Sequence, residues 1–466
     1  MKQILVLGLA MVGMCACSLQ AQDTRTVTEP VIPPACATLD AELTIAGAGH
    51  SGAALAAADE GKLDTERIQK AIDQCGKGKG VLLRAVPASA KGGVANAFLS
   101  GPLELREGVT LIVDKGTTLF ASRDPKVFET APGSCGIVDN KRGGCKPLIH
   151  VAHAKDAGVM GDGTIDGRGG DKMLGKDVSW WDLAEQARAG GDQETFRLIV
   201  ADGSGNFTIY RITLKNSPNF HVTYGHGDGF TVWGLKIDTP QRMARNTDGV
   251  DPGNGSKNIT ITHSFLREGD DNVALKGGAG GITNVSIVHN HFYWGHGMSI
   301  GSETNGGVSN IYVSDLSLDG PDNGIRIKSN GSRGGLTHEV VYDDVCVRNS
   351  PNPITLDTGY TAAGTPKGDS PPTMRDVTLH DVRVSGGGKF SFNGYDKEHR
   401  VGVNLDNVLI TDAVAYKYSI NHADIHLGPG PVNLQFPGGE DSTLTGKPGT
   451  GTAASCAEKF VPFPAM

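Results

Sequence analysis

Three segments of the sequence, NITI at 258–261, NVSI at 284–287 and NIYV at 310–313, each begin with asparagine and follow one another every 26 residues. NFTI at 206–209 begins in the same way, and weaker copies follow near residues 340 and 376. A unit of this length is too short to bury its own apolar face, so neighbouring units must stack. Short strands separated by Gly and Asn turns are typical of a parallel β-helix, in which each coil adds about 4.8 Å. We therefore predict an all-β chain folded as a single parallel β-helix.

Two other repeat architectures fit the pattern less well. Propeller blades are longer, and a leucine-rich horseshoe needs a Leu ladder that this sequence lacks. Residues 64–75 carry their apolar side chains on one helical face, which predicts a short helix. We expect this helix to cap the N-terminal end of the β-helix, and we expect no other helix after the leader.

The composition excludes several classes of protein. The chain has 466 residues, 66 of them Gly, and 38% of its residues are hydrophobic, which is enough to build a core and argues against disorder. The formal net charge of −8 argues against a nucleic-acid partner, because phosphates require a basic surface. It leaves an anionic small-molecule or polymer substrate possible, since a few local cations can bind one.

The N-terminus has the pattern of a secretory signal peptide. Lys2 precedes an apolar run at 4–14 that is too short to span a bilayer, and small residues follow it. We predict a signal peptide over 1–21, cleavage after Ala21 and a secreted, extracellular protein without a membrane span. The alternative is a lipoprotein of the outer membrane, lipidated at Cys17.

The remaining chain divides by composition into three parts. We predict a Pro- and Thr-rich linker at 22–35, the β-helix catalytic domain at 36–435 and an irregular tail at 436–466. Exported cysteines tend to form disulfides, and two pairs are expected, Cys135–Cys145 and Cys36–Cys75. No cysteine spacing suits zinc and no loop matches an EF-hand, so we predict neither a metal nor a cofactor.

Stacked coils bring residues of equal phase together. Asp270, His296 and Asp322 each lie 12 residues after the asparagine that opens their coil, so they should be near neighbours. Lys276 and Lys328 share a later phase and should lie on the same stripe of the surface.

The stripe carries a set of carboxylates that suggests acid–base chemistry. Asp248, Asp270 and Asp271 fall on consecutive coils, and such carboxylates can protonate a leaving oxygen and activate water in inverting glycoside hydrolysis. Crowding of like charges is expected to raise the pKa of one of them and keep it protonated as the acid. Arg326 and Lys328 on the same stripe suit a sugar that carries a carboxylate.

Four short motifs then resemble, in order and spacing, those of the polygalacturonase family, glycoside hydrolase family 28: NTD at 246–248, GDD at 269–271, GHG at 295–297 and RIK at 326–328. Longer stretches, such as SFLREGDDNVALK at 264–276 and GHGMSIGSE at 295–303, resemble the bacterial endopolygalacturonases in particular. The resemblance extends from about Cys36 to residue 400.

The resemblance implies a right-handed β-helix and inverting hydrolysis of internal α-1,4 bonds of polygalacturonate, the homogalacturonan of pectin. It implies that Asp270 is the general acid and that Asp248 and Asp271 hold and deprotonate the attacking water. It further implies that His296 supports the protonation state of these carboxylates and contacts the substrate.

Four more residues are assigned to substrate binding. The resemblance implies that Arg326 and Lys328 bind the galacturonate carboxylate beside the cleaved bond and that Asn246, from the first motif, contributes to the same site. Tyr360 follows Lys328 at a spacing similar to that between successive coils, and it is expected to stack on a sugar ring.

Several alternatives remain open at this point. An exo-acting polygalacturonase or a rhamnogalacturonan or xylogalacturonan hydrolase would use the same stripe. A pectate lyase would need calcium and a base for proton abstraction, and a non-catalytic polysaccharide-binding β-helix would need no carboxylate set. Nothing in the sequence requires oligomerisation, so we expect a monomer whose partner is its polymer substrate.

Overall fold

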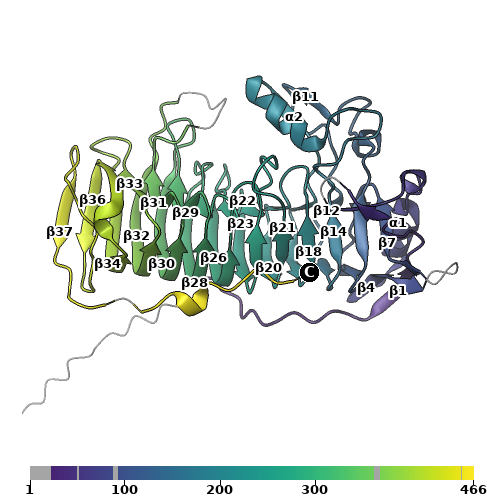
Figure 1. Cartoon of the computed structure of the whole chain (residues 1–466), viewed down its shortest axis with the longest axis horizontal. Coiled ribbons are helices and arrows are strands. Elements are labelled where there is room, and N and C mark those ends of the chain that lie inside the picture. The colour runs from purple at the N-terminus through teal and green to yellow at the C-terminus, as the bar shows by residue number, and fades with distance from the viewer. Residues whose placement is uncertain (1–21, 50–51, 88–92, 362–367, 453, 466) are drawn as a thin grey trace, which may run out of the picture.

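The chain winds into a right-handed parallel β-helix whose coils stack along the long axis of the molecule (Figure 1). The computed structural model describes residues 22–49, 52–87, 93–361, 368–452 and 454–465. The predicted signal peptide and Cys17 lie outside the described residues. Among the described residues, no helix is long and apolar enough to cross a membrane.

Two large parallel sheets form the walls of the coils. The 20-stranded sheet consists of β1 (Ala35–Asp40), β4 (Lys79–Arg84), β7 (Ala97–Ser100), β9 (Val109–Val113), β10 (Thr118–Ala121), β13 (Gly158–Met160), β14 (Thr164–Asp166), β17 (Gly205–Tyr210), β18 (Thr213–Lys215), β20 (Asp228–Trp233), β21 (Lys236–Asp238), β23 (Ser256–Thr262), β24 (Phe265–Arg267), β26 (Ile282–Phe292), β28 (Val308–Asp319), β30 (Leu336–Arg348), β32 (Thr373–Ser385), β34 (Val401–Ile410), β36 (Ala423–Leu427) and β37 (Thr443–Gly446). The 11-stranded sheet consists of β8 (Leu103–Glu104), β12 (Ile149–Ala152), β16 (Ile199–Asp202), β19 (Val222–Gly225), β22 (Val250–Gly253), β25 (Val273–Leu275), β27 (Met298–Ile300), β29 (Asn323–Lys328), β31 (Asn352–Asp357), β33 (Gly388–Asn393) and β35 (Tyr416–Asn421). Three antiparallel pairs add β2 (Gly47–Ala48) with β3 (Ala53–Ala54), β5 (Val86–Pro87) with β6 (Val94–Ala95), and β11 (Ile137–Asp139) with β15 (Asp192–Glu194).

The repeated asparagines occupy the corner of each coil. Asn258, Asn284 and Asn310 all have φ of 58–60°, the left-handed region that Asn tolerates better than most residues. The Nδ2 of Asn284 donates to Oδ1 of Asn258 at 3.1 Å, and the Nδ2 of Asn310 donates to Oδ1 of Asn284 at 2.7 Å. The 26-residue period therefore reflects a ladder of amides that holds successive coils in register.

Apolar side chains alternate with outward residues along the 11-stranded sheet. Val273, Met298, Ile325 and Ile354 occupy one register column and are fully buried in the core. Fully burying a side chain of this size contributes about 1.5–3 kcal/mol. The residues between them point away from the core, and this alternation places polar side chains on the outer face of the sheet.

The predicted N-terminal helix is present, and a second helix corrects our expectation. α1 (Thr65–Gln74) buries Ile68 and Ile72 at the N-terminal end of the β-helix. α2 (Trp180–Gln186) begins at Ser179, whose hydroxyl and backbone form a capping box with Asp182. At seven residues α2 is too short to show helical periodicity in the sequence, and it buries Trp180 as a packing residue.

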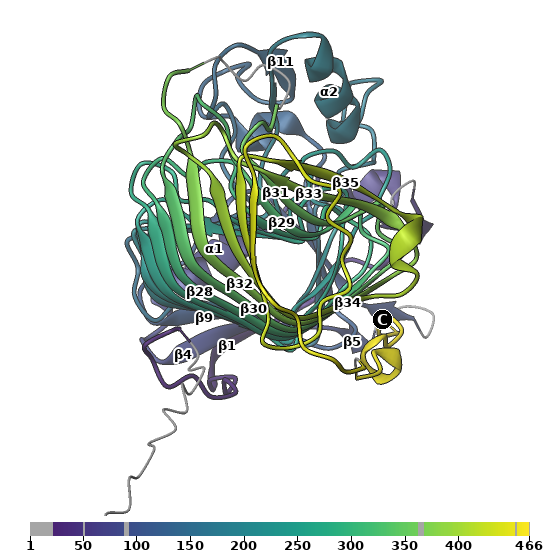
Figure 2. The ribbon, with the colours of Figure 1, turned by 90° about the vertical axis from the view of Figure 1, so that its left-hand side faces the viewer.

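Short 3-10 helices fill several connections: η1 (Ala57–Asp59), η2 (Pro125–Phe128), η3 (Ala187–Ala189), η4 (Ala413–Ala415) and η5 (Ala457–Lys459). α2 and β11 form a lobe that stands on the side of the 11-stranded sheet, as the view along the coils shows (Figure 2).

The segment predicted as a linker is packed against the coils. Residues 22–34 form no strand, yet Asp23 is buried, its N–H donates to Ser286 Oγ at 3.0 Å, and its carboxylate accepts from Thr260 Oγ1 at 2.7 Å. Tyr210 donates to Glu29 Oε1 at 2.7 Å further along. This segment is an ordered strap across the 20-stranded sheet rather than a free connection.

Three disulfides link the described cysteines. Cys36–Cys75 and Cys135–Cys145 are the two pairs expected from the sequence, and Cys346–Cys456 is a third. The third disulfide fastens the C-terminal tail to β30. Beyond it, the tail lies along the coils, where Phe463 packs edge-on against Tyr293.

Candidate active site

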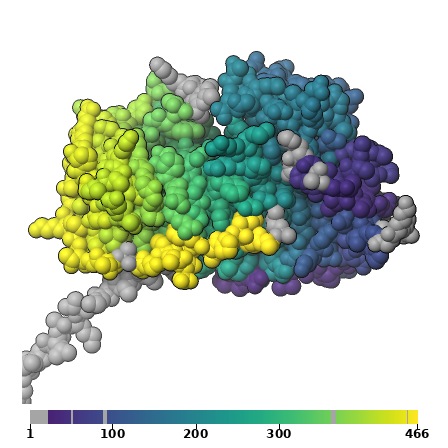
Figure 3. Space-filling view, in the orientation of Figure 1, coloured from purple at the N-terminus to yellow at the C-terminus, as the bar shows by residue number. Residues whose placement is uncertain are grey.

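The predicted site residues gather on the outer face of the 11-stranded sheet, on four consecutive coils. Asp248 precedes β22, the Asp270–Asp271 pair precedes β25, and His296 precedes β27. Arg326 and Lys328 lie on β29 and alternate with core residues. Figure 3 shows the surface hollowed above these coils, between a green lobe and the teal-blue lobe that carries α2.

Asp270 and His296 form a hydrogen-bonded ion pair across adjacent coils. Asp270 Oδ1 lies 2.9 Å from His296 Nδ1, and His296 Nε2 lies 3.4 Å from Asp322 Oδ2. Burial acts to lower the pKa of His296, but the two carboxylates outweigh it and raise the pKa to about 10. The three residues are neighbours, as their shared phase predicted.

The electrostatics of Asp270 differ from our expectation. Burial acts to raise the pKa of Asp270, but the hydrogen bond and charge of His296, together with the charges of Lys328 and Lys276, lower it well below its usual range. The proton of this pair therefore rests on His296 in the free site. The expectation that like-charge crowding keeps the acid protonated was wrong for Asp270, because the hydrogen bond and charge of His296 act more strongly in the opposite direction.

Asp271 is surrounded by donors. Its Oδ1 accepts from Ser299 Oγ at 2.7 Å and from Arg326 at 3.3 Å, and its Oδ2 accepts from Lys328 Nζ at 2.6 Å. Burial acts to raise the pKa of Asp271, but the two cations lower it, so the group is ionised. Arg326 and Lys328, predicted to bind substrate, thus also neutralise Asp271.

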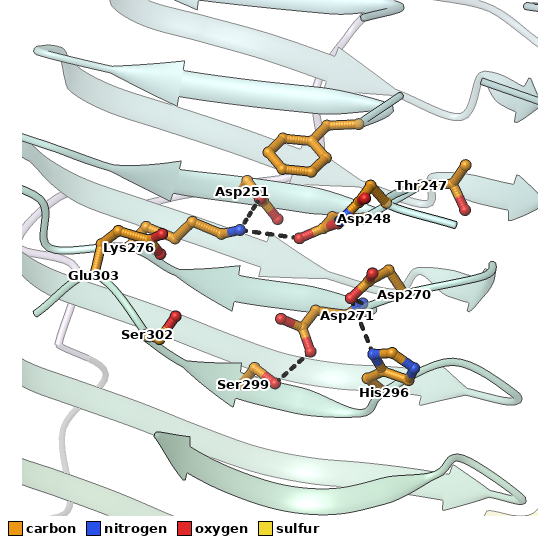
Figure 4. Close-up of polar contacts among 12 residues, drawn as sticks. Thr247, Asp248, Asp251, Asp270, Asp271, Lys276, His296, Ser299, Ser302 and Glu303 are labelled. Carbon is orange, nitrogen blue, oxygen red and sulfur yellow. Dashed lines mark hydrogen bonds and ion pairs between the residues drawn. The ribbon is translucent and has the colours of Figure 1, made fainter. Parts of the chain in front are cut away.

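Asp248 belongs to a second buried ionic cluster, visible in Figure 4. Lys276 Nζ lies 3.0 Å from Asp248 Oδ2 and 2.9 Å from Asp251 Oδ2. Burial and the charge of Asp251 raise the pKa of Asp248 well above its usual range, despite Lys276. Burial likewise raises the pKa of Asp251 to about 6. Like-charge crowding therefore acts here, at Asp248.

The two remaining predicted residues border this set. Tyr360 lies beside both cations, with the Arg326 guanidinium carbon and Lys328 Nζ each 5.2 Å from its ring centroid. Asn246 accepts a hydrogen bond at 3.1 Å from Gln193 on β15, so it connects the site to the α2 lobe. Tyr360 joins the cluster, and Asn246 lies at its margin.

Sequence reasoning missed three residues of these clusters: Ser299 donates to Asp271, and Lys276 pairs with both Asp248 and Asp251. Asp251 and Ser299 alternate with core residues on β22 and β27, and this alternation was the only available signal. Lys276 was placed on the charged stripe by its phase but received no role. Its position beside Asp248 depends on which way its long side chain turns, and a repeat does not specify that.

Three donor groups of the site lie close enough together to be compared with a metal site. Ligand atoms of Asp270, Asp271 and His296 lie within 4.8 Å of one another. His296 carries a proton, and Asp271 already binds two cations, so this donor set suits proton transfer better than metal ligation. We assign no metal to these residues.

A comparison with family models matches residues 79–426 to "Glycosyl hydrolases family 28". The chain belongs to glycosyl hydrolase family 28. Among its family 28 relatives, an endo-polygalacturonase of Pectobacterium carotovorum subsp. carotovorum is 44% identical over 413 residues, covering 88% of this chain and 95% of the relative. A polygalacturonase of Ralstonia solanacearum is 36% identical and covers 94% of this chain and 92% of the relative.

A solved family 28 structure shares the fold. The polygalacturonase from Erwinia carotovora ssp. carotovora superposes with a TM-score of 0.77 at 43% identity, covering 86% of this chain and 99% of the other. The predicted family and the right-handed β-helix are confirmed. In this family 28 chain, the site combines one protonated His–Asp pair, one ionised carboxylate and one carboxyl of raised pKa, which are the parts needed for general acid–base catalysis.

Proposed function

We propose that the chain hydrolyses internal α-1,4 bonds of polygalacturonate with inversion of configuration. The observation that carries the proposal is the juxtaposition of Asp248, Asp270 and Asp271 on adjacent coils with the cations Arg326 and Lys328. Inverting hydrolysis needs an acid and a base, and a carboxylated sugar needs cations. The endo-polygalacturonases among the relatives support both the substrate and the internal mode of attack.

We assign the acid role to Asp270, working together with His296. The pair holds one proton between Asp270 Oδ1 and His296 Nδ1. As the bond between the anomeric carbon and the leaving oxygen breaks, the proton on His296 Nδ1 passes to Asp270, and Asp270 passes it on to that oxygen. The pair therefore ends the step with one proton fewer.

We assign the base role to Asp248, with Asp271 orienting the water. Asp248 Oδ1 is buried and has no hydrogen-bond partner among the described residues, so it is the oxygen that can accept from water. A carboxylate of raised pKa is also a stronger proton acceptor once ionised. Asp271 is held by Ser299, Arg326 and Lys328, which keeps it ionised and fixed. The attacking water bonds to the anomeric carbon and passes its proton to Asp248.

We assign substrate binding to Arg326, Lys328 and Tyr360. The two cations would attract the carboxylate of the galacturonate unit beside the cleaved bond, and Tyr360 would pack on a sugar ring. Asn246 would contribute from the margin of the site, where its partner Gln193 links it to the lobe.

Digestion of polygalacturonate in EDTA tests the proposal. Reducing ends, ultraviolet absorbance of unsaturated products and viscosity should be followed together. We expect new reducing ends without absorbance and an early fall in viscosity. Reducing ends with little loss of viscosity would assign exo-attack, and absorbance that requires calcium would assign a lyase. Activity only on rhamnogalacturonan or xylogalacturonan would assign that polymer as the substrate in place of polygalacturonate.

We also propose that the mature protein is exported after cleavage following Ala21 and acts as a monomer. The three disulfides support an oxidising compartment, since thiols stay reduced in the cytosol. The mass of the protein recovered from culture medium tests the cleavage, and a mass larger by a lipid at Cys17 would contradict it.

A further inference from the structure

We propose that Arg197 binds the carboxylate of a second galacturonate unit, on the opposite side of the cleaved bond from Arg326 and Lys328. The inference rests on the proposed function, because it requires a polymer with a carboxylate on each sugar.

Arg197 is an exposed cation that pairs with none of the described acidic residues. It precedes β16 on the same outer face, and among the described ranges no carboxylate lies within ion-pair distance of it. Its guanidinium carbon lies 4.8 Å from the ring centroid of Phe220, so the side chain packs on an aromatic face. Stacking in this way orients the guanidinium while leaving its N–H donors available.

Arg197 is exposed but has protein close around it. The side chain is solvent-exposed, yet protein encloses it closely enough that burial lowers the pKa of the guanidinium. The charges of Asp251 and Asp248 act in the opposite direction, which places Arg197 within electrostatic range of the carboxylate set. Lys276 Nζ lies 4.6 Å from the same Phe220 ring and connects this region to Asp248.

The other cations near the site are already committed to acidic partners. Lys276 binds Asp248 and Asp251, and Lys328 binds Asp271. Arg197 therefore differs from them in having a planar fork of donors free for a carboxylate, which can accept two parallel hydrogen bonds from it.

The position of Arg197 matches a substrate that runs along the axis of the β-helix, across successive coils. Leu198 N donates to Phe220 O, and His221 N donates to Asp248 O, so Arg197 lies two coils before Asp248. At about 4.8 Å per coil this is about 10 Å. Arg326 lies two coils beyond the Asp270 coil in the other direction. Cations thus bracket the carboxylate set, as a polyanionic chain bound across it requires.

The test is a kinetic comparison on end-labelled oligogalacturonates of three to six units. The variants are Arg197→Gln, Arg197→Lys and, as a matched control, Arg375→Gln, which removes an exposed arginine from β32 on the 20-stranded sheet. We expect R197Q to raise KM for the hexamer about five- to tenfold, as loss of one charged hydrogen-bonding partner implies, with kcat nearly unchanged. The rise should shrink as the oligomer shortens, and the preferred cleavage point should shift.

Two further results separate the possible failures. An unchanged KM and cleavage pattern in R197Q, relative to R375Q, would overturn this inference while leaving the proposed function intact. A wild-type protein that cleaves none of the oligomers would instead refute the proposed function. If R197Q is less stable than wild type, R197K provides the test, because lysine keeps the positive charge but lacks the planar guanidinium. We expect R197K to raise KM about twofold. A KM equal to that of wild type would overturn the inference.

Discussion

Asp251 provides the sharpest test of the electrostatics around Asp248. Its carboxylate is buried on β22, and Lys276 is its only ion-pair partner among the described residues. Burial raises its pKa from 3.8 to about 6, so ionising it in the folded protein opposes folding. The substitution Asp251→Asn keeps the shape and removes the ionisation.

The direction of the effect follows from proton linkage. Between pH 3.8 and 6 the folded state binds more protons at Asp251 than the unfolded state does, so the stabilising effect present at low pH is lost as pH rises through 6. A pKa raised from 3.8 to about 6 corresponds to about 3 kcal/mol, most of it lost between pH 4 and 7. The asparagine variant lacks this loss. We therefore expect its free energy of unfolding, relative to wild type, to increase by about 2–3 kcal/mol from pH 4 to pH 7.

Urea unfolding of both proteins at the two pH values, with disulfides intact, measures this difference. A matched activity profile should show a second effect, because the charge of Asp251 helps to raise the pKa of Asp248. Removing that charge should lower the pKa of Asp248 and extend activity to lower pH. A stability difference between the two proteins that does not change with pH would refute the reasoning. So would an acidic limb of the activity profile that moves to higher pH in the variant.

Three other perturbations have defined outcomes. Asp322→Asn removes a carboxylate that raises the pKa of His296, so the alkaline limb of the pH profile of kcat should move to lower pH. An alkaline limb that does not move would contradict the role assigned to the Asp270–His296 pair. Asn284→Ala breaks the amide ladder at a left-handed corner and should reduce stability by about 1–3 kcal/mol in thermal or urea unfolding, whereas the exposed Asn404→Ala should change it little. Cys456→Ser should release the tail to limited proteolysis while leaving kcat unchanged, because its disulfide lies on the 20-stranded sheet, away from the site; a large loss of kcat would show that the tail supports the site.

The repeat made much of the fold and the site predictable. Because each coil repeats a phase, Asp270 had to lie near His296, and His296 near Asp322. The same logic explains the asparagine ladder, since a left-handed corner recurring every coil favours one residue type.

Features that break the repeat could not be predicted in the same way. α2 is a short insertion defined by a cap rather than by periodicity, and the strap around Asp23 is held by isolated polar contacts across more than 200 residues. The pKa of Asp270 depends on a hydrogen-bond geometry, and the cluster around Lys276 depends on a side-chain rotamer. Neither is encoded in spacing alone.

The most direct test of the central claim is the turnover of polygalacturonate by Asp270→Asn, measured together with its affinity for the polymer. Asparagine cannot donate the proton that the leaving oxygen needs, so we predict that kcat falls by about 10²–10⁴-fold while the polymer still binds. Turnover within a few-fold of wild type would contradict the assignment of Asp270 as the acid. Binding without turnover in the wild-type protein itself would make the chain a polysaccharide-binding β-helix rather than a hydrolase.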